Sequence, residues 1–305
     1  MTMRDAGLLL GGIDGGNPLG FLTGVGTLRT ATLAKPCNDW RVKWVSLGGI
    51  WSPELMTDWS ICPGELVELL ASALKRETPE FDFDRNLAVS PETFRKFARR
   101  AQYSASSVER GCADFMAAFG CDAVAVDDGK TIQDTALRTM SGAGHQHFLG
   151  TMKQLVDETS ATDLHRSLFD PWTYRDRKMG LRWDPLEDRR YALRWSNPSG
   201  GDGVPTMRGA NRLAVEALPL LPTAPGVKRL ETTGFAGSGR TTTFSWPIWD
   251  CALDVDVVRS VLARAEIQAA EPDRAALQTT GIVEVYRSRR ITVGKFRNFV
   301  TARTA

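Results

Sequence analysis

LLLGGIDGGNPLGFL, residues 8–22, contains the first strand-to-helix turn of the chain and sets the class of fold. Its apolar start, residues 8–13, predicts a buried strand, and the Gly/Asn/Pro turn after it leads into a helix over residues 18–33. Asn17 and Pro18 are favoured residues for the N-cap and the first position of a helix. A strand followed directly by a helix is how an α+β or α/β domain begins.

The predicted helix contains three glycines, Gly20, Gly24 and Gly26, which weaken a helix intrinsically. We therefore expect another element to pack closely against it.

The rest of the chain predicts an α+β fold with mixed helices and short antiparallel strands. Residues 40–45 alternate as a half-buried strand does, and the stretch from Ser90 to Phe119 predicts two helices broken near residues 103–107. Residues 121–135 are rich in turn formers, and residues 170–205 predict short strands and long loops. The other expected elements are helices over 63–75, 145–159, 207–218 and 254–265, a strand pair within 229–246 and a final strand over 282–291.

The length of 305 residues exceeds what one hydrophobic core usually serves, so either two packed lobes or one large α+β domain is expected. The clearest linker is the proline-rich segment 219–225. The sequence therefore predicts an α+β main lobe over residues 1–218 and a smaller α+β lobe with a basic C-terminal segment over residues 226–305.

Composition sets the broad class but names no partner. The chain is 42% hydrophobic and 24% charged, as in an ordinary globular protein, and its net charge is only +2. The five cysteines are odd in number, scattered and never in a CxxC pair, which predicts reduced, mostly buried thiols rather than disulfides or a zinc site. The apolar run of residues 7–13 is too short to span a membrane, so we expect a cytoplasmic protein without membrane partners.

Two fragments suggest enzyme chemistry without completing it. Residues 12–17 resemble the first phosphate loop of sugar kinases and other actin-like ATPases, but they lead into a helix where that loop leads into a second strand. His145 and His147 do not share a helix face, and His165 has no marked catalytic partner. The sequence therefore predicts no catalytic residue, no resident metal and no cofactor in these fragments.

A third fragment keeps one enzymatic alternative open. Asp184, Glu187 and Asp188 lie close together in the sequence, and a metal-dependent nuclease would need such carboxylates. Flanking arginines make internal salt bridges the simpler interpretation. The chain is accordingly predicted to be non-enzymatic, with this nuclease as the alternative.

The basic C-terminal segment gives the better functional signal. After Glu284 the chain has no acidic residue, and aromatic residues alternate with its cations, as in many nucleic-acid-binding surfaces. On a strand, Arg287 and Arg289 face one side while Arg290 faces the other, and a turn at Gly294 can return later cations to the same side. The predicted contacts in this segment are Arg287, Arg289, Arg290, Lys295 and Arg297.

Two glycine-rich loops and one helix supply further cations. The loop of residues 234–241 contains Arg240, and the loop of residues 196–203 contains Asn197 and is followed by Arg208. Arg95, Lys96, Arg99 and Arg100 recur at helical spacing, for which a solvated face is favoured over a phosphate-binding one.

Three segments give the chain a family resemblance: Asn17-Pro18-Leu19-Gly20-Phe21-Leu22 with Gly26-Thr27-Leu28-Arg29, then residues 141–148, and Asp170-Pro171-Trp172. With them the sequence resembles CRISPR-associated proteins of type I-G, formerly called I-U, particularly the large-subunit-like component of the surveillance complex. Residues 183–185 and 287–295 are also similar to extensions found with the helicase-nuclease of the same systems.

The resemblance implies a non-catalytic subunit of a Cascade-type, RNA-guided complex in antiviral defence. Its implied partners are the CRISPR backbone subunits, the guide RNA, double-stranded target DNA and the helicase-nuclease. The five cations of the C-terminal segment are then expected to contact the nucleic-acid backbone. Arg240, Asn197 and Arg208 are expected to contact bases or the flanking motif, and a stand-alone nucleic-acid-binding module remains the other alternative.

Overall fold

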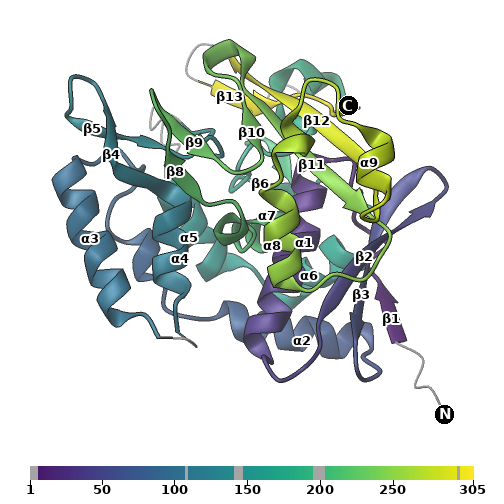
Figure 1. Cartoon of the computed structure of the whole chain (residues 1–305). Coiled ribbons are helices and arrows are strands. Elements are labelled where there is room, and N and C mark those ends of the chain that lie inside the picture. The colour runs from purple at the N-terminus through teal and green to yellow at the C-terminus, as the bar shows by residue number, and fades with distance from the viewer. Residues whose placement is uncertain (1–5, 107–108, 141–146, 195–202, 294–295) are drawn as a thin grey trace.

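The computed structural model describes residues 6–106, 109–140, 147–194, 203–293 and 296–305. It has an α+β fold, which confirms the predicted class: helices pack against small antiparallel sheets (Figure 1). Within the described residues, no helix is long and apolar enough to cross a membrane.

The first strand, β1 (Ala6–Leu9), ends earlier than the sequence predicts. The chain turns at Leu10, whose amide donates to the Pro53 carbonyl oxygen, and the Gly12 amide donates to the Leu168 carbonyl oxygen. A Cβ on Gly12 would stand 2.5 Å from the Asp170 carbonyl oxygen, so this close approach requires glycine. Residues 11–13 therefore form a tight turn rather than the second half of a strand.

The central helix is α1 (Pro18–Ala34), and it begins where the sequence predicts. The Asn17 side-chain oxygen accepts from the Leu19 amide at 2.9 Å and caps the helix. Nearly all of α1 is buried, against α2 (Pro63–Leu74), α7 (Arg208–Val215) and α8 (Val255–Leu262). A Cβ on Gly26 would overlap the Leu213 carbonyl oxygen of α7. The predicted close packing at the helix glycines is thus confirmed.

A three-stranded antiparallel sheet has the order β1-β3-β2. In β2 (Arg41–Leu47), Val42 and Trp44 are buried while their neighbours are partly exposed, as the predicted alternation requires. The hairpin to β3 (Ile50–Thr57) turns through Gly48 and Gly49, both with positive φ, which suits a two-residue hairpin loop.

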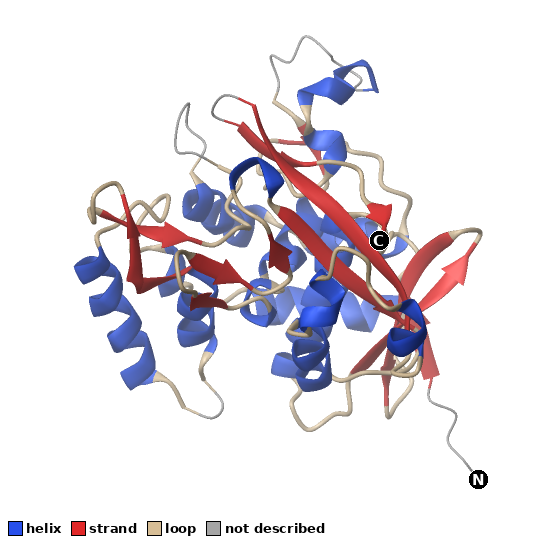
Figure 2. Cartoon of the chain, turned by 45° about the horizontal axis from the view of Figure 1, so that its top comes forward, coloured by secondary structure: helices blue, strands red, loops and turns tan. Residues whose placement is uncertain are grey.

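The larger sheet has the order β10-β11-β12-β13 and adds β14 beside β12. Its strands are β10 (Phe235–Ala236), β11 (Thr243–Trp249), β12 (Ile282–Val293), β13 (Phe296–Phe299) and β14 (Arg303–Thr304). Two buried indoles join this sheet to the N-terminal part: Trp246 donates to the Gly15 carbonyl oxygen and Trp249 to that of Val42, both at 2.8 Å. Figure 2 shows β11 and β12 crossing in front of the helices.

The remaining elements surround this centre. They are α3 (Pro91–Ser104), α4 (Gly111–Phe119), β4 (Gly120–Val126), β5 (Thr131–Asp134), α5 (Phe148–Glu158), α6 (Ala161–Phe169), β6 (Asp176–Arg177), β7 (Pro205–Thr206), β8 (Thr223–Pro225), β9 (Leu230–Thr232) and α9 (Arg274–Gln278). Short 3-10 helices lie at Pro79–Phe81, Pro185–Glu187, Arg189–Arg194, Leu218–Leu220, Gly239–Thr241 and Ala265–Gln268.

A buried charge cluster connects three helical segments. The Glu216 carboxylate, just after α7, accepts from Arg29 of α1 at 2.7 Å and from Arg212 at 2.9 Å. Arg76, just after α2, lies 3.4 Å from the same carboxylate, and its guanidinium and that of Arg29 each stand 5.5 Å from the Phe115 ring. The positive charges of the arginines hold the pKa of Glu216 at about 2 against the effect of burial.

The predicted boundary at 219–225 stays a prediction. Leu218–Leu220 are buried in a 3-10 helix, and Thr223–Pro225 pair with β9. One cluster of buried hydrophobic residues includes Leu10 and Phe299, from the two sides of this segment.

The turn-rich segment 121–135 forms the hairpin of β4 and β5, and Asp127, Asp128 and Gly129 adopt positive φ at its tip. One local expectation was wrong. The cysteines are not mostly buried: Cys37, Cys62 and Cys251 are exposed, and the other two are partly exposed. All five are free, as expected.

Candidate nucleic-acid interface

Strand β12 carries the predicted arginines on two sides. Arg287 and Arg289 line one pocket, and Arg290 lines another, as the alternation of a strand predicts. Ser288, which lies between Arg287 and Arg289 in the sequence, is fully buried. The alternation thus produces two separate basic sites.

The first site, which we call the arginine pocket, has a volume of about 840 Å³. Four arginines line it: Arg190, Arg287, Arg289 and Arg303. Among the described lining residues none is an aspartate or glutamate, although Ala305 also borders the pocket and its carbonyl oxygen accepts from Arg274. Asp188, which is not in this lining, pairs with Arg190, so the positive potential of the pocket comes mainly from Arg287, Arg289 and Arg303.

Arg287 is held in place by uncharged groups. Its guanidinium donates to Ser245 Oγ and to the Ala270 carbonyl oxygen, both at 2.9 Å, and to the Ala269 carbonyl oxygen at 2.5 Å. Desolvation lowers the pKa of this arginine from its ordinary value, but it remains a cation at neutral pH. These contacts fix the side chain while leaving its charge without a carboxylate partner.

Arg289 differs from Arg287 in being exposed. Within the described part of the chain, its side chain makes no hydrogen bond or ion pair. Arg303, on β14 beside Arg287, is exposed as well. Both side chains are free to contact a ligand, and neither is needed to hold the fold together.

Tyr191 provides an aromatic edge to the arginine pocket. It lies in the 3-10 helix Arg189–Arg194, and its hydroxyl is 3.2 Å from Thr301 Oγ1. The guanidinium groups of Arg190 and Arg194 lie 6.0 and 5.5 Å from the ring centre. Arg190 also pairs with Asp188 at 2.9 Å. Cations next to a partly exposed aromatic ring, as here, are a combination that single-stranded nucleic acid favours.

The second site, which we call the second pocket, contains Arg290 and Arg297 and has a volume of about 660 Å³. Arg297 on β13 is paired with Thr292, two residues along β12 from Arg290, so the two arginines share a face of the sheet. Arg297 therefore does not join Arg287 and Arg289.

The other predicted residues are dispersed. Arg240 is exposed in the 3-10 helix Gly239–Thr241, which packs against β12, but it lines neither pocket. Lys295 and Asn197 lie outside the described residues.

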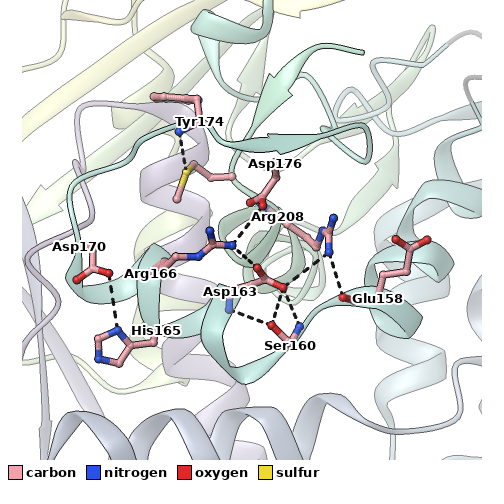
Figure 3. A network of polar contacts seen from close by, with 10 residues as sticks. Glu158, Ser160, Asp163, His165, Arg166, Asp170, Tyr174, Asp176 and Arg208 are labelled. Carbon is pink, nitrogen blue, oxygen red and sulfur yellow. Dashed lines mark hydrogen bonds and ion pairs between the residues drawn. The ribbon is translucent and has the colours of Figure 1, made fainter. Parts of the chain in front are cut away.

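Arg208 belongs to a different polar network, shown in Figure 3. Its guanidinium donates to the Glu158 carbonyl oxygen at 3.4 Å and lies 3.9 Å from the Asp163 carboxylate. Its amide donates to the Asp176 carboxylate at 2.8 Å, and Arg166 bridges the same two aspartates. Arg208 thus fastens the start of α7 to α6 and β6 and lines neither of the two basic pockets.

The carboxylates of the nuclease alternative have separate partners. Asp184 accepts from the Tyr174 hydroxyl at 2.8 Å, Glu187 accepts from the Arg182 amide at 2.7 Å and from Thr206 Oγ1, and Asp188 pairs with Arg190. Among the described residues, no three histidine, cysteine or acidic side chains are arranged to hold a metal ion. Burial, and next the charge of Asp184, raise the pKa of Glu187 to about 7.

Sequence reasoning missed the contribution of residues 190–194 to the interface. The signal was present, because Arg190, Tyr191 and Arg194 combine cations with an aromatic ring within five positions. Only the arginines that flank the neighbouring carboxylates were interpreted, as salt-bridge partners, which holds for Arg190; Tyr191 was not considered.

Comparisons with known proteins add no family. No protein-family model matches the chain, and no curated protein sequence matches it either. The functional interpretation therefore rests on the geometry above and on the resemblance of the sequence.

Proposed function

We propose that this protein is a non-catalytic, nucleic-acid-binding subunit of a Cascade-type CRISPR surveillance complex and that it acts in the cytoplasm. The observation that carries the nucleic-acid part of the proposal is the arginine pocket, where four arginines converge and no acidic side chain is found among the described lining residues. The part of the proposal that concerns the CRISPR complex rests on the resemblance of the sequence to type I-G proteins.

Phosphodiester backbones suit this pocket for an electrostatic reason. Each phosphate neutralised by an arginine releases condensed counterions, which drives binding and makes it sensitive to salt. Arg289 and Arg303 are exposed and Arg287 is held rigidly by Ser245 and main-chain oxygens, so one fixed and two adjustable cations face the ligand. Such a surface positions a backbone and does not by itself read sequence.

The proposed partners follow from the separate tasks of the guide RNA and of this subunit. The guide RNA reads the target sequence by base pairing, while this subunit holds double-stranded target DNA next to its flanking motif. The net charge of +2 leaves most other faces free of strong repulsion, so backbone subunits, and also the helicase-nuclease, can dock there. A stand-alone nucleic-acid-binding module would have the same pocket without these partners.

Co-purification from the native operon tests the proposal. The tagged full chain is isolated at low salt, and bound RNA and proteins are identified by sequencing and mass spectrometry. The proposal expects guide RNA and sister subunits with the wild-type protein, and loss of DNA binding by the isolated protein on Arg287→Ala/Arg289→Ala substitution. Nucleic-acid binding without sister subunits would instead favour the stand-alone module, and recovery of a lone protein without nucleic acid would contradict both.

A matched control is available on α3. Arg99 and Arg100 are exposed arginines that line neither pocket. The Arg99→Ala/Arg100→Ala variant removes the same net charge as Arg287→Ala/Arg289→Ala. We expect the control variant to keep target binding, because the contribution of an arginine to DNA binding depends on its position as well as on its charge.

A further inference from the structure

The second pocket has features that the proposed function does not use. It lies on the other side of β12 from Arg287 and Arg289, and its cationic lining comes from several segments that are distant in the sequence. Its arginines are Arg138, Arg229, Arg290 and Arg297.

Arg290 and Arg297 are both fixed by main-chain oxygens of one short segment. Arg290 Nη1 donates to the Ala136 carbonyl oxygen at 2.5 Å, and Arg297 Nη1 donates to the Arg138 carbonyl oxygen at 3.4 Å. Arg290 Nε is buried and has no hydrogen-bond partner within the described chain. Two guanidinium groups are thereby held near each other while part of their donor capacity is unused.

Within the described residues, neither Arg290 nor Arg297 forms an ion pair with a carboxylate. Asp134, which also lines the pocket, is in an ion pair with Arg138. The other two acidic residues of the lining, Asp127 and Glu231, are exposed and in reach of water. Burial, and next the charge of Arg297, lower the pKa of Arg290 to about 10, and the charge of Asp134 offsets part of this effect.

The lining also includes a short glycine-containing segment. Its residues are Gly237, Ser238 and Gly239, and both glycines have positive φ. Arg229 also lines the pocket and makes no side-chain hydrogen bond or ion pair in the described structure. A ligand with two or more oxygens and a negative charge would satisfy the unused donors and relieve the repulsion between the arginines.

We propose that Arg290 and Arg297 bind one phosphate group in the second pocket, at a site separate from the arginine pocket. The guanidinium groups donate to the phosphate oxygens, and Arg229 closes over the ligand from β9's side of the pocket. The phosphate belongs either to a small phosphate compound or to the end of a nucleic-acid strand, and the binding chemistry is the same for both.

Calorimetric titration of the full chain with inorganic phosphate tests the site, with chloride used to keep the ionic strength constant. We expect saturable binding by the wild-type protein and at least tenfold weaker binding by Arg290→Gln/Arg297→Gln. In the Arg287→Ala/Arg289→Ala background, which removes the phosphate contacts of the arginine pocket, adding Arg290→Gln/Arg297→Gln should cause the same loss of phosphate binding. That background separates this inference from the proposed function, since each pocket can fail without the other.

A second variant guards against misfolding. The only described side-chain hydrogen bond of Arg297 is the long one to Arg138, so Arg297→Gln alone should keep the fold and still weaken phosphate binding at least threefold. Melting temperatures and circular dichroism establish that each variant is folded. Equal phosphate affinity of the wild type and a folded Arg297→Gln protein, or no phosphate binding above that of chloride, would overturn the proposal.

Oligonucleotides identify the source of the phosphate. Single strands with and without a 5′ phosphate are compared on the wild type and on Arg290→Gln/Arg297→Gln. Tighter binding of the phosphorylated strand that is lost in the variant assigns the pocket to a strand end. Equal binding of the two strands, together with variant-sensitive binding of inorganic phosphate, assigns it to a small phosphate compound.

Discussion

Arg289 and Arg290 are adjacent on β12, yet their side chains line two different pockets. The exposed Arg289 reaches the arginine pocket, whereas Arg290 is partly buried and donates to the Ala136 carbonyl oxygen. The strand therefore distributes a run of cations between an open surface and a more enclosed site. The consequences of removing each cation are expected to differ accordingly.

Arg289→Ala should weaken nucleic-acid binding and leave stability unchanged. The side chain makes no described contact with the protein, so its loss costs only phosphate contacts. We expect roughly three- to tenfold weaker binding and a salt slope smaller by about one. Fluorescence anisotropy at several salt concentrations measures both quantities, and a large drop in the melting temperature would show that Arg289 has a structural role instead.

Glu216→Gln should destabilise the fold strongly. The substitution removes the only acidic partner of the buried Arg29 and Arg212 side chains among their described ion pairs. An uncompensated buried charge costs about 3–5 kcal/mol, which urea unfolding measures. Glu266, an exposed glutamate 3.6 Å from Arg264, provides the control, and its change to Gln should leave the unfolding curve in place.

The same carboxylate predicts an acid-dependent loss of stability. The pKa of Glu216 is about 2 in the fold, below the ordinary value of 4.5, so the folded state binds this proton less readily than the unfolded state. Its contribution is fully present above pH 4.5 and is lost as the pH falls towards 2. The difference in unfolding free energy between the wild type and Glu216→Gln should shrink over that range, and a constant difference would contradict the assignment.

Glu187 predicts the opposite pH dependence. The pKa of Glu187 is raised to about 7, so the folded state holds the proton more tightly than the unfolded state. The free energy of unfolding therefore falls as the pH rises from about 4.5 to 7. Glu187→Gln removes the charge and keeps an oxygen to accept from the Arg182 amide. We expect the variant to be more stable than the wild type at pH 8, by about 1–3 kcal/mol, and the two to converge at pH 4.

Gly26→Ala tests the packing of α1 against α7. A Cβ at this position would overlap the Leu213 carbonyl oxygen, so the helices must separate, at a cost of about 1–3 kcal/mol or more. Gly111, in α4, has open space around its Cβ position. Gly111→Ala should therefore be neutral or slightly stabilising in the same thermal unfolding experiment.

The sequence was most informative where local chemistry determines structure. Asn17 and Pro18 located the start of α1, and the alternation of Val42 and Trp44 located β2, because caps and periodicity act over a few residues. It failed at α6 (Ala161–Phe169), which follows α5 after only two residues, Thr159 and Ser160, although Ser160 and Asp163 form a capping box there. The capping box is a local signal, but whether so short a helix forms next to it depends on tertiary packing.

The candidate site was predictable in the same uneven way. Strand alternation correctly separated Arg287 and Arg289 from Arg290, since it needs only the period of a strand. It gave no means of knowing that Tyr191 would stand at the same pocket, or that Arg208 would pair with Asp163 in a separate network. Those relationships join residues far apart in the sequence and come from the fold.

The most direct test of the account is the salt dependence of DNA binding by the full chain and by Arg287→Ala/Arg289→Ala/Arg303→Ala. The affinity for flanked target duplex is measured between about 50 and 200 mM salt, and the slope of log affinity against log salt is compared. The account predicts a slope smaller by about two to three in the triple variant and an unchanged slope in Arg99→Ala/Arg100→Ala. Equal slopes for the wild type and the triple variant would contradict the assignment of the arginine pocket as the nucleic-acid interface.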